Sequence, residues 1–182
     1  MIKIKDIGNF ESVPQIVNDI IKGNTKALDE HLSGGWDIEK GIKIGKYTTL
    51  SPLDIALIME SFNSVKWLVE KGVNLNVKGN PSFLLAVRYC DEAVIRYLAE
   101  HGAKVNCVNE VKTEAFSQAL YGKKYENLPI IHELGHRVEK YGGQAFRSAV
   151  SDRNYEVLDF FIKNGVDINY NAADSVYPFK PT

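Results

Sequence analysis

The chain has 182 residues and a formal net charge of −1, with 45% hydrophobic and 25% charged residues. This composition is typical of a folded globular chain, and the near-neutral charge argues against nucleic-acid binding. The sequence has no apolar run of membrane-spanning length, no apolar secretion signal at its start, and only two cysteines, too few for a disulfide framework. We therefore expect a cytoplasmic protein that binds neither nucleic acid nor membranes.

Five similar segments follow one another along the chain, and each contains a glycine at the same point. These glycines are Gly35, Gly72, Gly102, Gly135 and Gly165. An alanine stands 16 residues before each of the last four, and these alanines are Ala56, Ala86, Ala119 and Ala149. A large apolar residue stands three positions before each alanine, namely Leu53, Phe83, Phe116 and Phe146. Self-similarity at a fixed period of this length indicates a repeat protein.

We place the segments, in chain order, at about residues 13–47, 48–79, 80–110, 111–141 and 142–171 of a single domain that spans residues 1–182. The first segment has Asp19 in place of the alanine and His31 in place of an apolar residue. We interpret these charged positions as the solvent-facing side of a terminal repeat, which has no neighbour to pack against.

Each segment is predicted to form two helices and a glycine stop. In the second segment, Leu53, Ala56 and Leu57 share one face of a helix. A polar break follows at residues 61–64, and then a second apolar stretch leads to Gly72, which suits the left-handed turn that ends a helix. Because one such pair cannot bury its apolar positions alone, we expect successive pairs to stack on one another.

Two stretches of the second segment resemble the ankyrin repeat. Residues 51–57, S-P-L-D-I-A-L, are similar to its opening T-P-L-H-x-A-A, and residues 65–76, V-K-W-L-V-E-K-G-V-N-L-N, to its closing V-K-L-L-L-E-x-G-A-D-V-N. The closing pattern returns at residues 95–106 and 158–169, although only the second segment keeps the proline and none keeps the histidine. The resemblance implies an all-α solenoid of stacked helix–turn–helix units with short finger loops, which binds a partner protein.

The fourth segment also contains a possible zinc motif. His132, Glu133 and His136 match H-E-x-x-H, in which two histidines on one helix face bind zinc and the glutamate acts as a base. In the repeat register, however, the helix should end at Gly135, between the two histidines. We therefore expect no catalytic residues, metal or cofactor, with a zinc metallohydrolase as the alternative.

The resemblance implies that a partner binds the concave face and the fingers of the solenoid. The concave positions on the first helices are expected to be Ile55, Ile58, Met59, Leu85, Arg88, Tyr89, Gln118 and Tyr121. The long finger between the first two segments adds Lys40, Lys43, Lys46 and Tyr47, which could form a basic lip for an acidic partner or simply a solvated loop. Tyrosine and arginine often dominate binding energy at interfaces.

The sequence leaves two further points open. We expect a monomeric interaction module, but a self-associating structural repeat protein is also compatible with the same pattern. The tail at residues 172–182 is expected either to fold back as a cover for the last segment or to remain a disordered, adhesive end. Its apolar residues include Val176, Tyr177 and Phe179.

Overall fold

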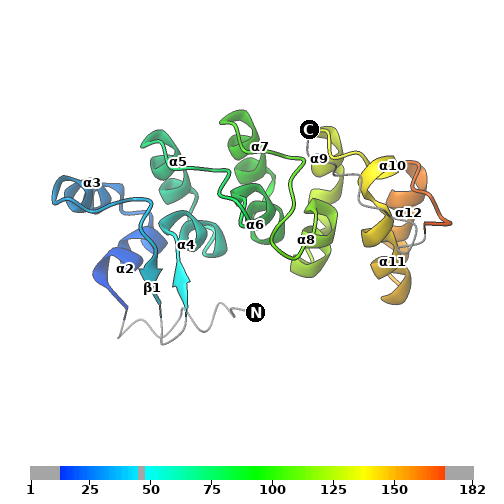
Figure 1. The fold of residues 1–182 in the computed structure, drawn as a ribbon, viewed down its shortest axis with the longest axis horizontal. Helices are drawn as coiled ribbons and strands as arrows, with labels where there is room; N and C mark the ends of the chain where they lie inside the picture. The colour runs from blue at the N-terminus through cyan, green and yellow to red at the C-terminus, as the bar shows by residue number, and fades with distance from the viewer. Residues whose placement is uncertain (1–12, 45–47, 171–182) are drawn as a thin grey trace.

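The computed structural model describes residues 13–44 and 48–170, and these are mostly helical (Figure 1). The prediction of a mainly helical chain is confirmed. The helices are α2 (Gln15–Lys22), α3 (Thr25–Ser33), α4 (Pro52–Ile58), α5 (Phe62–Glu70), α6 (Ser82–Tyr89), α7 (Glu92–Glu100), α8 (Ala115–Gly122), η2 (Tyr125–Asn127), α9 (Leu128–Glu133), α10 (Val138–Tyr141), α11 (Gly143–Ser151) and α12 (Tyr155–Lys163). The predicted tail lies outside the described residues.

The helices form antiparallel pairs that lie in a row along the long axis of the molecule (Figure 1). The first helices of successive pairs contact one another in series, α2 with α4, α4 with α6, α6 with α8, and α8 with α11. Each alanine of the repeat lies in one of these first helices and is buried, which allows the neighbouring helices to approach closely. The buried apolar residues of all pairs form one continuous core.

All five repeat glycines adopt the left-handed backbone conformation, with φ between +80° and +103°. Each follows the second helix of its pair, as the sequence predicts. Because a Cβ placed at any of the five would meet nothing within 4 Å, the backbone conformation and not crowding explains glycine at these positions. The helix stops at the glycine positions are therefore confirmed.

A ladder of hydrogen bonds joins the turns of successive pairs. Four residues after Gly35 and after Gly72, a side-chain oxygen accepts a backbone N–H of the next turn: Glu39 Oε1 from Asn74 at 2.7 Å, and Asn76 Oδ1 from Lys104 at 2.8 Å. Four residues after Gly102, Asn106 Oδ1 instead lies 3.0 Å from the Nδ1 atom of His136. Each of the first three turns is thus tied to the next by the same position of the repeat.

The long finger between α3 and α4 forms a two-stranded antiparallel hairpin. Its strands are β1 (Ile42–Lys43) and β2 (Thr49–Leu50), in which Ile42 pairs with Leu50. Ile42 and Leu50 are buried against the core, which anchors the hairpin beside the first helices.

The interpretation of Asp19 as a solvent-facing residue is wrong, whereas the His31 side chain remains 34% exposed. The Oδ2 atom of Asp19 lies 3.0 Å from the Nε2 atom of His31, and Asp19 is only 4% exposed. Its Oδ1 atom accepts hydrogen bonds from Gln15 and Asn24 at 3.3 Å. The two residues that depart from the repeat pattern, Asp19 and His31, are therefore hydrogen-bonding partners of each other within the first pair.

Candidate functional site

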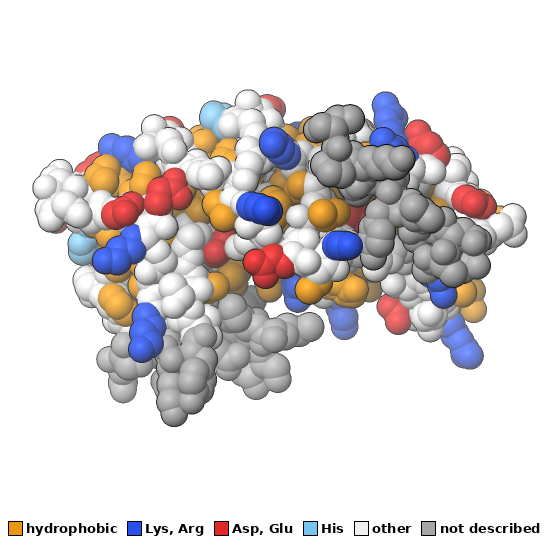
Figure 2. All heavy atoms as spheres, viewed as in Figure 1, with side chains coloured by type: hydrophobic (Ala, Val, Ile, Leu, Met, Phe, Trp, Pro, Cys, Tyr) orange, Lys and Arg blue, Asp and Glu red, His pale blue; other side chains and the backbone are white. Residues whose placement is uncertain are grey.

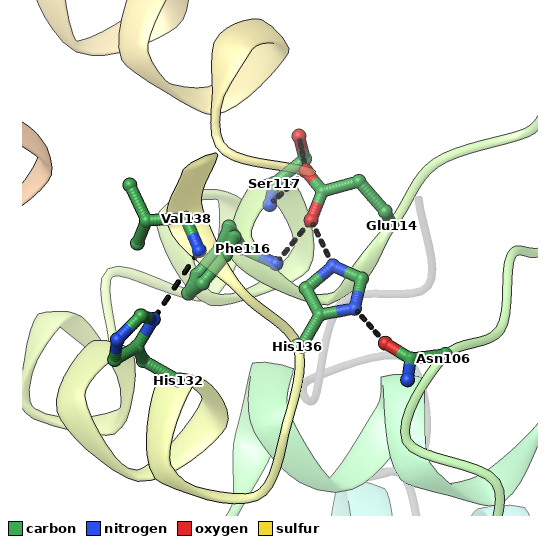
Figure 3. Close-up of polar contacts among 7 residues, drawn as sticks. All are labelled: Asn106, Glu114, Phe116, Ser117, His132, His136 and Val138. Carbon is green, nitrogen blue, oxygen red and sulfur yellow. Dashed lines mark hydrogen bonds and ion pairs between the residues drawn. The ribbon is translucent and has the colours of Figure 1, made fainter. Parts of the chain in front are cut away.

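The H-E-x-x-H motif does not place two histidines on one helix face. Helix α9 ends at Glu133, and Gly135 reverses the chain with a φ of +103° before His136 is reached. His132 lies in the last turn of α9, whereas His136 lies in the turn beyond it (Figure 3). The expectation that the helix ends between the two histidines is confirmed.

His136 is fully buried, and both of its ring nitrogens are engaged. Its Nε2 atom lies 3.0 Å from Oε2 of Glu114, and its Nδ1 atom lies 3.0 Å from Oδ1 of Asn106 (Figure 3). The ring stacks on Tyr141 with a centroid separation of 4.3 Å. His132 is occupied separately, because its Nδ1 atom accepts the backbone N–H of Val138 at 3.2 Å.

Glu114 links His136 to the start of α8. It is the N-cap of this helix, and its carboxylate accepts the backbone N–H groups of Phe116 at 2.6 Å and Ser117 at 2.8 Å, as well as the hydroxyl of Ser117. The carboxylate thus satisfies free helix amides and the buried imidazole together. The arrangement holds α8 against the turn after α9, and within residues 13–44 and 48–170 no group of three potential metal ligands is found.

The concave residues expected from the sequence divide into buried and accessible groups. Ile55, Ile58 and Gln118 are at most 5% exposed, because neighbouring elements of the row cover them, and we do not retain them as contact residues. Met59, Leu85, Arg88 and Tyr89 are half-buried, and Tyr121 is 53% exposed. We call the five accessible residues Met59, Leu85, Arg88, Tyr89 and Tyr121 the first-helix surface, which extends over α4, α6 and α8.

Gln118 is buried and contacts Arg88 of the first-helix surface. Its Oε1 atom accepts a hydrogen bond of 3.3 Å from Nη1 of Arg88, whose guanidinium carbon lies 5.3 Å from the centre of the Tyr89 ring. Arg88 and Tyr89 are therefore held side by side, with Gln118 as a hydrogen-bond partner of Arg88.

Gly122 sets the distance between α6 and α8, and the repeat pattern did not reveal its role. A β-carbon at this position would overlap the backbone carbonyl of Arg88. The only sequence signal is that Gly122 stands where the other segments have larger residues, such as Met59 and Tyr89.

The finger residues predicted for binding are only partly described. Lys40 and Lys43 are exposed, with Lys43 on β1 opposite Thr49. Lys46 and Tyr47 lie outside the described residues.

Some basic side chains of the described residues form ion pairs and others do not. On the second helices, Lys71 pairs with Asp29 at 2.9 Å and Arg96 with Glu92 and Glu133 at 2.6 Å. The hydrogen bond from Lys71, followed by that from Trp67, lowers the pKa of Asp29. In the connections between pairs, by contrast, four exposed lysines form no ion pair within the described part of the chain: Lys40, Lys43, Lys78 and Lys104.

Both cysteines, Cys90 and Cys107, are free thiols. Cys90 is buried at the end of α6, where its Sγ atom donates to the carbonyl of Leu57 at 3.3 Å. Burial raises the pKa of Cys90 and of Cys107 to about 12, so neither is suited to act as a nucleophile near neutral pH.

Comparison with known proteins gives no match, either to a protein-family model or to a curated protein. Among the helices in the described residues, none has the length and apolar character needed to cross a membrane.

Proposed function

We propose that the chain is an ankyrin-like repeat protein that binds a partner protein through the first-helix surface and the adjoining connections between pairs. The proposal includes no catalytic activity or cofactor, and it places the protein in the cytoplasm as a monomer. The observation that carries it is the first-helix surface itself: apolar and aromatic side chains with one arginine, accessible on three first helices that contact in series.

Several features support this surface over other parts of the molecule. Tyr89 and Arg88 are of the residue types that contribute most to binding at interfaces, and Gln118 fixes their orientation. The ladder ties the turns of successive pairs together, and Gly122 allows α8 to pack closely against α6. A rigid surface of this kind loses little conformational freedom when a partner binds.

The test is capture of a partner from native lysate, its identification by mass spectrometry, and measurement of its affinity for variants. We expect Arg88→Ala, Tyr89→Ala and Tyr121→Ala each to weaken binding by about 1 kcal/mol or more if they anchor the partner. The control is Tyr155→Ala, which removes a more exposed tyrosine from α12, away from the first-helix surface. Affinities that are the same for all four variants would contradict the proposal.

The two competing functions predict different measurements. A zinc enzyme would contain stoichiometric zinc when purified without a tag, and His132→Ala would remove it. A self-associating protein would show a concentration-dependent mass in light scattering. We expect neither result.

A further inference from the structure

Two connections between pairs lie side by side and are cross-linked by hydrogen bonds. They are the α5–α6 connection, residues 71–81, and the α7–α8 connection, residues 101–114; both cross the front of the molecule in Figure 1. Asn76 accepts the backbone N–H of Lys104 at 2.8 Å and donates to the carbonyl of Gly102 at 2.9 Å. Further along, the backbone N–H of Glu110 donates to the carbonyl of Gly79 at 3.0 Å.

The α7–α8 connection holds its tip in a fixed and strained conformation. Asn109 Oδ1 accepts the backbone N–H groups of Val111 at 3.1 Å and Thr113 at 2.9 Å. Lys112 has a φ of +60°, a left-handed conformation that is costly for a residue with a side chain. Val111, immediately before it, is 79% exposed.

The α5–α6 connection is also held in place by contacts with neighbouring elements. Asn80 donates to Asp54 of α4 at 3.1 Å. Gly79 provides the space for Glu110, because a β-carbon there would lie 2.6 Å from the Glu110 Cγ atom. Val77 and Lys78 lie between the two cross-links and are exposed, Val77 by 43%.

We call Val77, Lys78, Lys104 and Val111 the connection surface. Its two valines are exposed apolar side chains, and its two lysines form no ion pair among the described residues. Figure 2 shows separate lysine and arginine side chains, with apolar side chains and a few acidic ones between them, on the face that carries these connections. This combination matches a ligand that carries negative charges beside apolar groups.

We infer that the connection surface binds a short acidic segment of a partner protein in which carboxylates flank apolar side chains. The carboxylates pair with Lys78 and Lys104, and the apolar side chains cover Val77 and Val111. A nucleic acid would use the lysines but not the valines, and the chain as a whole carries no excess positive charge. The inference rests on the proposed function, because it names the chemistry of the partner that this module binds.

The test measures fluorescence anisotropy of labelled synthetic peptides with the full chain. The main probe alternates glutamate with leucine and valine. The comparison probes are a peptide of glutamate and serine, a peptide of lysine and leucine, and a single-stranded oligonucleotide. We expect the first probe to bind at least about tenfold more tightly than any of the others.

Variants then assign the binding to the connection surface. Lys78→Glu and Lys104→Glu should each weaken the first probe by about tenfold, and Val111→Ser by about fivefold. Lys26→Glu, an equal charge change at an exposed site on α3, and Ile162→Ser, an exposed apolar site on α12, should change it by less than about twofold. Circular dichroism with thermal unfolding verifies that all variants are folded.

Each contrary result overturns the inference. Tighter binding of the oligonucleotide would indicate a nucleic-acid site, and equal binding of the two acidic peptides would remove the role of the valines. Equal losses in the control variants, or no measurable binding of the first probe, would remove the site altogether. Because the proposed function is tested separately with Tyr89→Ala, Tyr121→Ala and the native partner, failure of the inference can be distinguished from failure of the proposed function.

Discussion

The first and fourth pairs of helices both contain a carboxylate bonded to a histidine, and the two sites differ in depth. In the first pair, the side chain of His31 remains 34% exposed beside Asp19. In the fourth, His136 is completely buried and the side chain of Glu114 is 9% exposed. Water can replace a lost partner at the first site but not at the second. The same chemical contact should therefore matter far more in the fourth pair.

The repeat itself suggests how the buried site of the fourth pair can be broken and repaired. Glu114 occupies the position of Ser51, the N-cap of α4, and His136 occupies the position of Val73 and Val166. We expect Glu114→Ser alone, or His136→Val alone, to lower the free energy of unfolding by about 3–5 kcal/mol, because each leaves a buried polar group without its partner. The double variant restores the chemistry of the other pairs and should recover most of this loss.

Urea unfolding followed by circular dichroism measures these changes. The matched control is His132→Val, which removes the other histidine of the motif and only one hydrogen bond. Single variants that unfold like the control, or a double variant no more stable than either single one, would show that the buried pair does not act as a unit.

The Asp19–His31 site of the first pair, where the histidine is partly exposed, should give a smaller effect. We expect Asp19→Ala to lower the free energy of unfolding by about 1–2 kcal/mol, because Asp19 loses three hydrogen bonds while His31 can turn to water. Both tryptophans, Trp36 and Trp67, stack on each other in the first two pairs, so tryptophan fluorescence reports this end of the row. A loss as large as that of Glu114→Ser would contradict the difference in depth.

The smallest effect concerns the thiols, and it reports local opening near the fourth pair. With a pKa of about 12, only about one Cys107 in ten thousand is ionised at pH 8, so labelling by a thiol reagent should be slow. Cys107 follows Asn106, which contacts His136. Glu114→Ser should therefore accelerate labelling of Cys107 more than that of Cys90, as measured by mass spectrometry of the labelled peptides.

The same pKa shifts predict a dependence of stability on pH. Because the pKa of each thiol is higher in the folded chain than its ordinary value of 9.0, the unfolded chain loses its proton first as the pH rises. The thiols therefore leave stability unchanged below about pH 9 and lower it progressively between about pH 9 and pH 12. Cys90→Ala should reduce this alkaline loss in urea unfolding, and an unchanged pH profile would show that burial does not control these thiols.

Sequence reasoning succeeded where a single residue determines the local backbone conformation. A left-handed turn requires glycine or a strained side chain, so the five repeat glycines predicted the ends of five helices and separated His132 from His136. It failed where two residues that depart from the repeat pattern, at different places in the sequence, bond to each other in the folded chain. Asp19 and His31 each look exposed when judged alone, and only the folded pair shows that they bond to each other.

The candidate surface was predicted less well than the helices for a related reason. Position within one helix does not say how far the next helix covers it, so Ile55, Ile58 and Gln118 appeared accessible although the row buries them. Gly122 and the cross-links of the connection surface depend on contacts between pairs, which the spacing of residues within a pair does not encode.

The ladder between turns gives the row a direction. Glu39 and Asn76 each accept a backbone N–H of the following turn, so the second and third units are each fastened by the one before. Asn169 stands at the equivalent place after Gly165, and within the described residues no later unit follows it. If a further helix pair were joined after this end, the side chain of Asn169 would be placed to accept a backbone N–H of its turn. The row of pairs could therefore be extended at its carboxyl end.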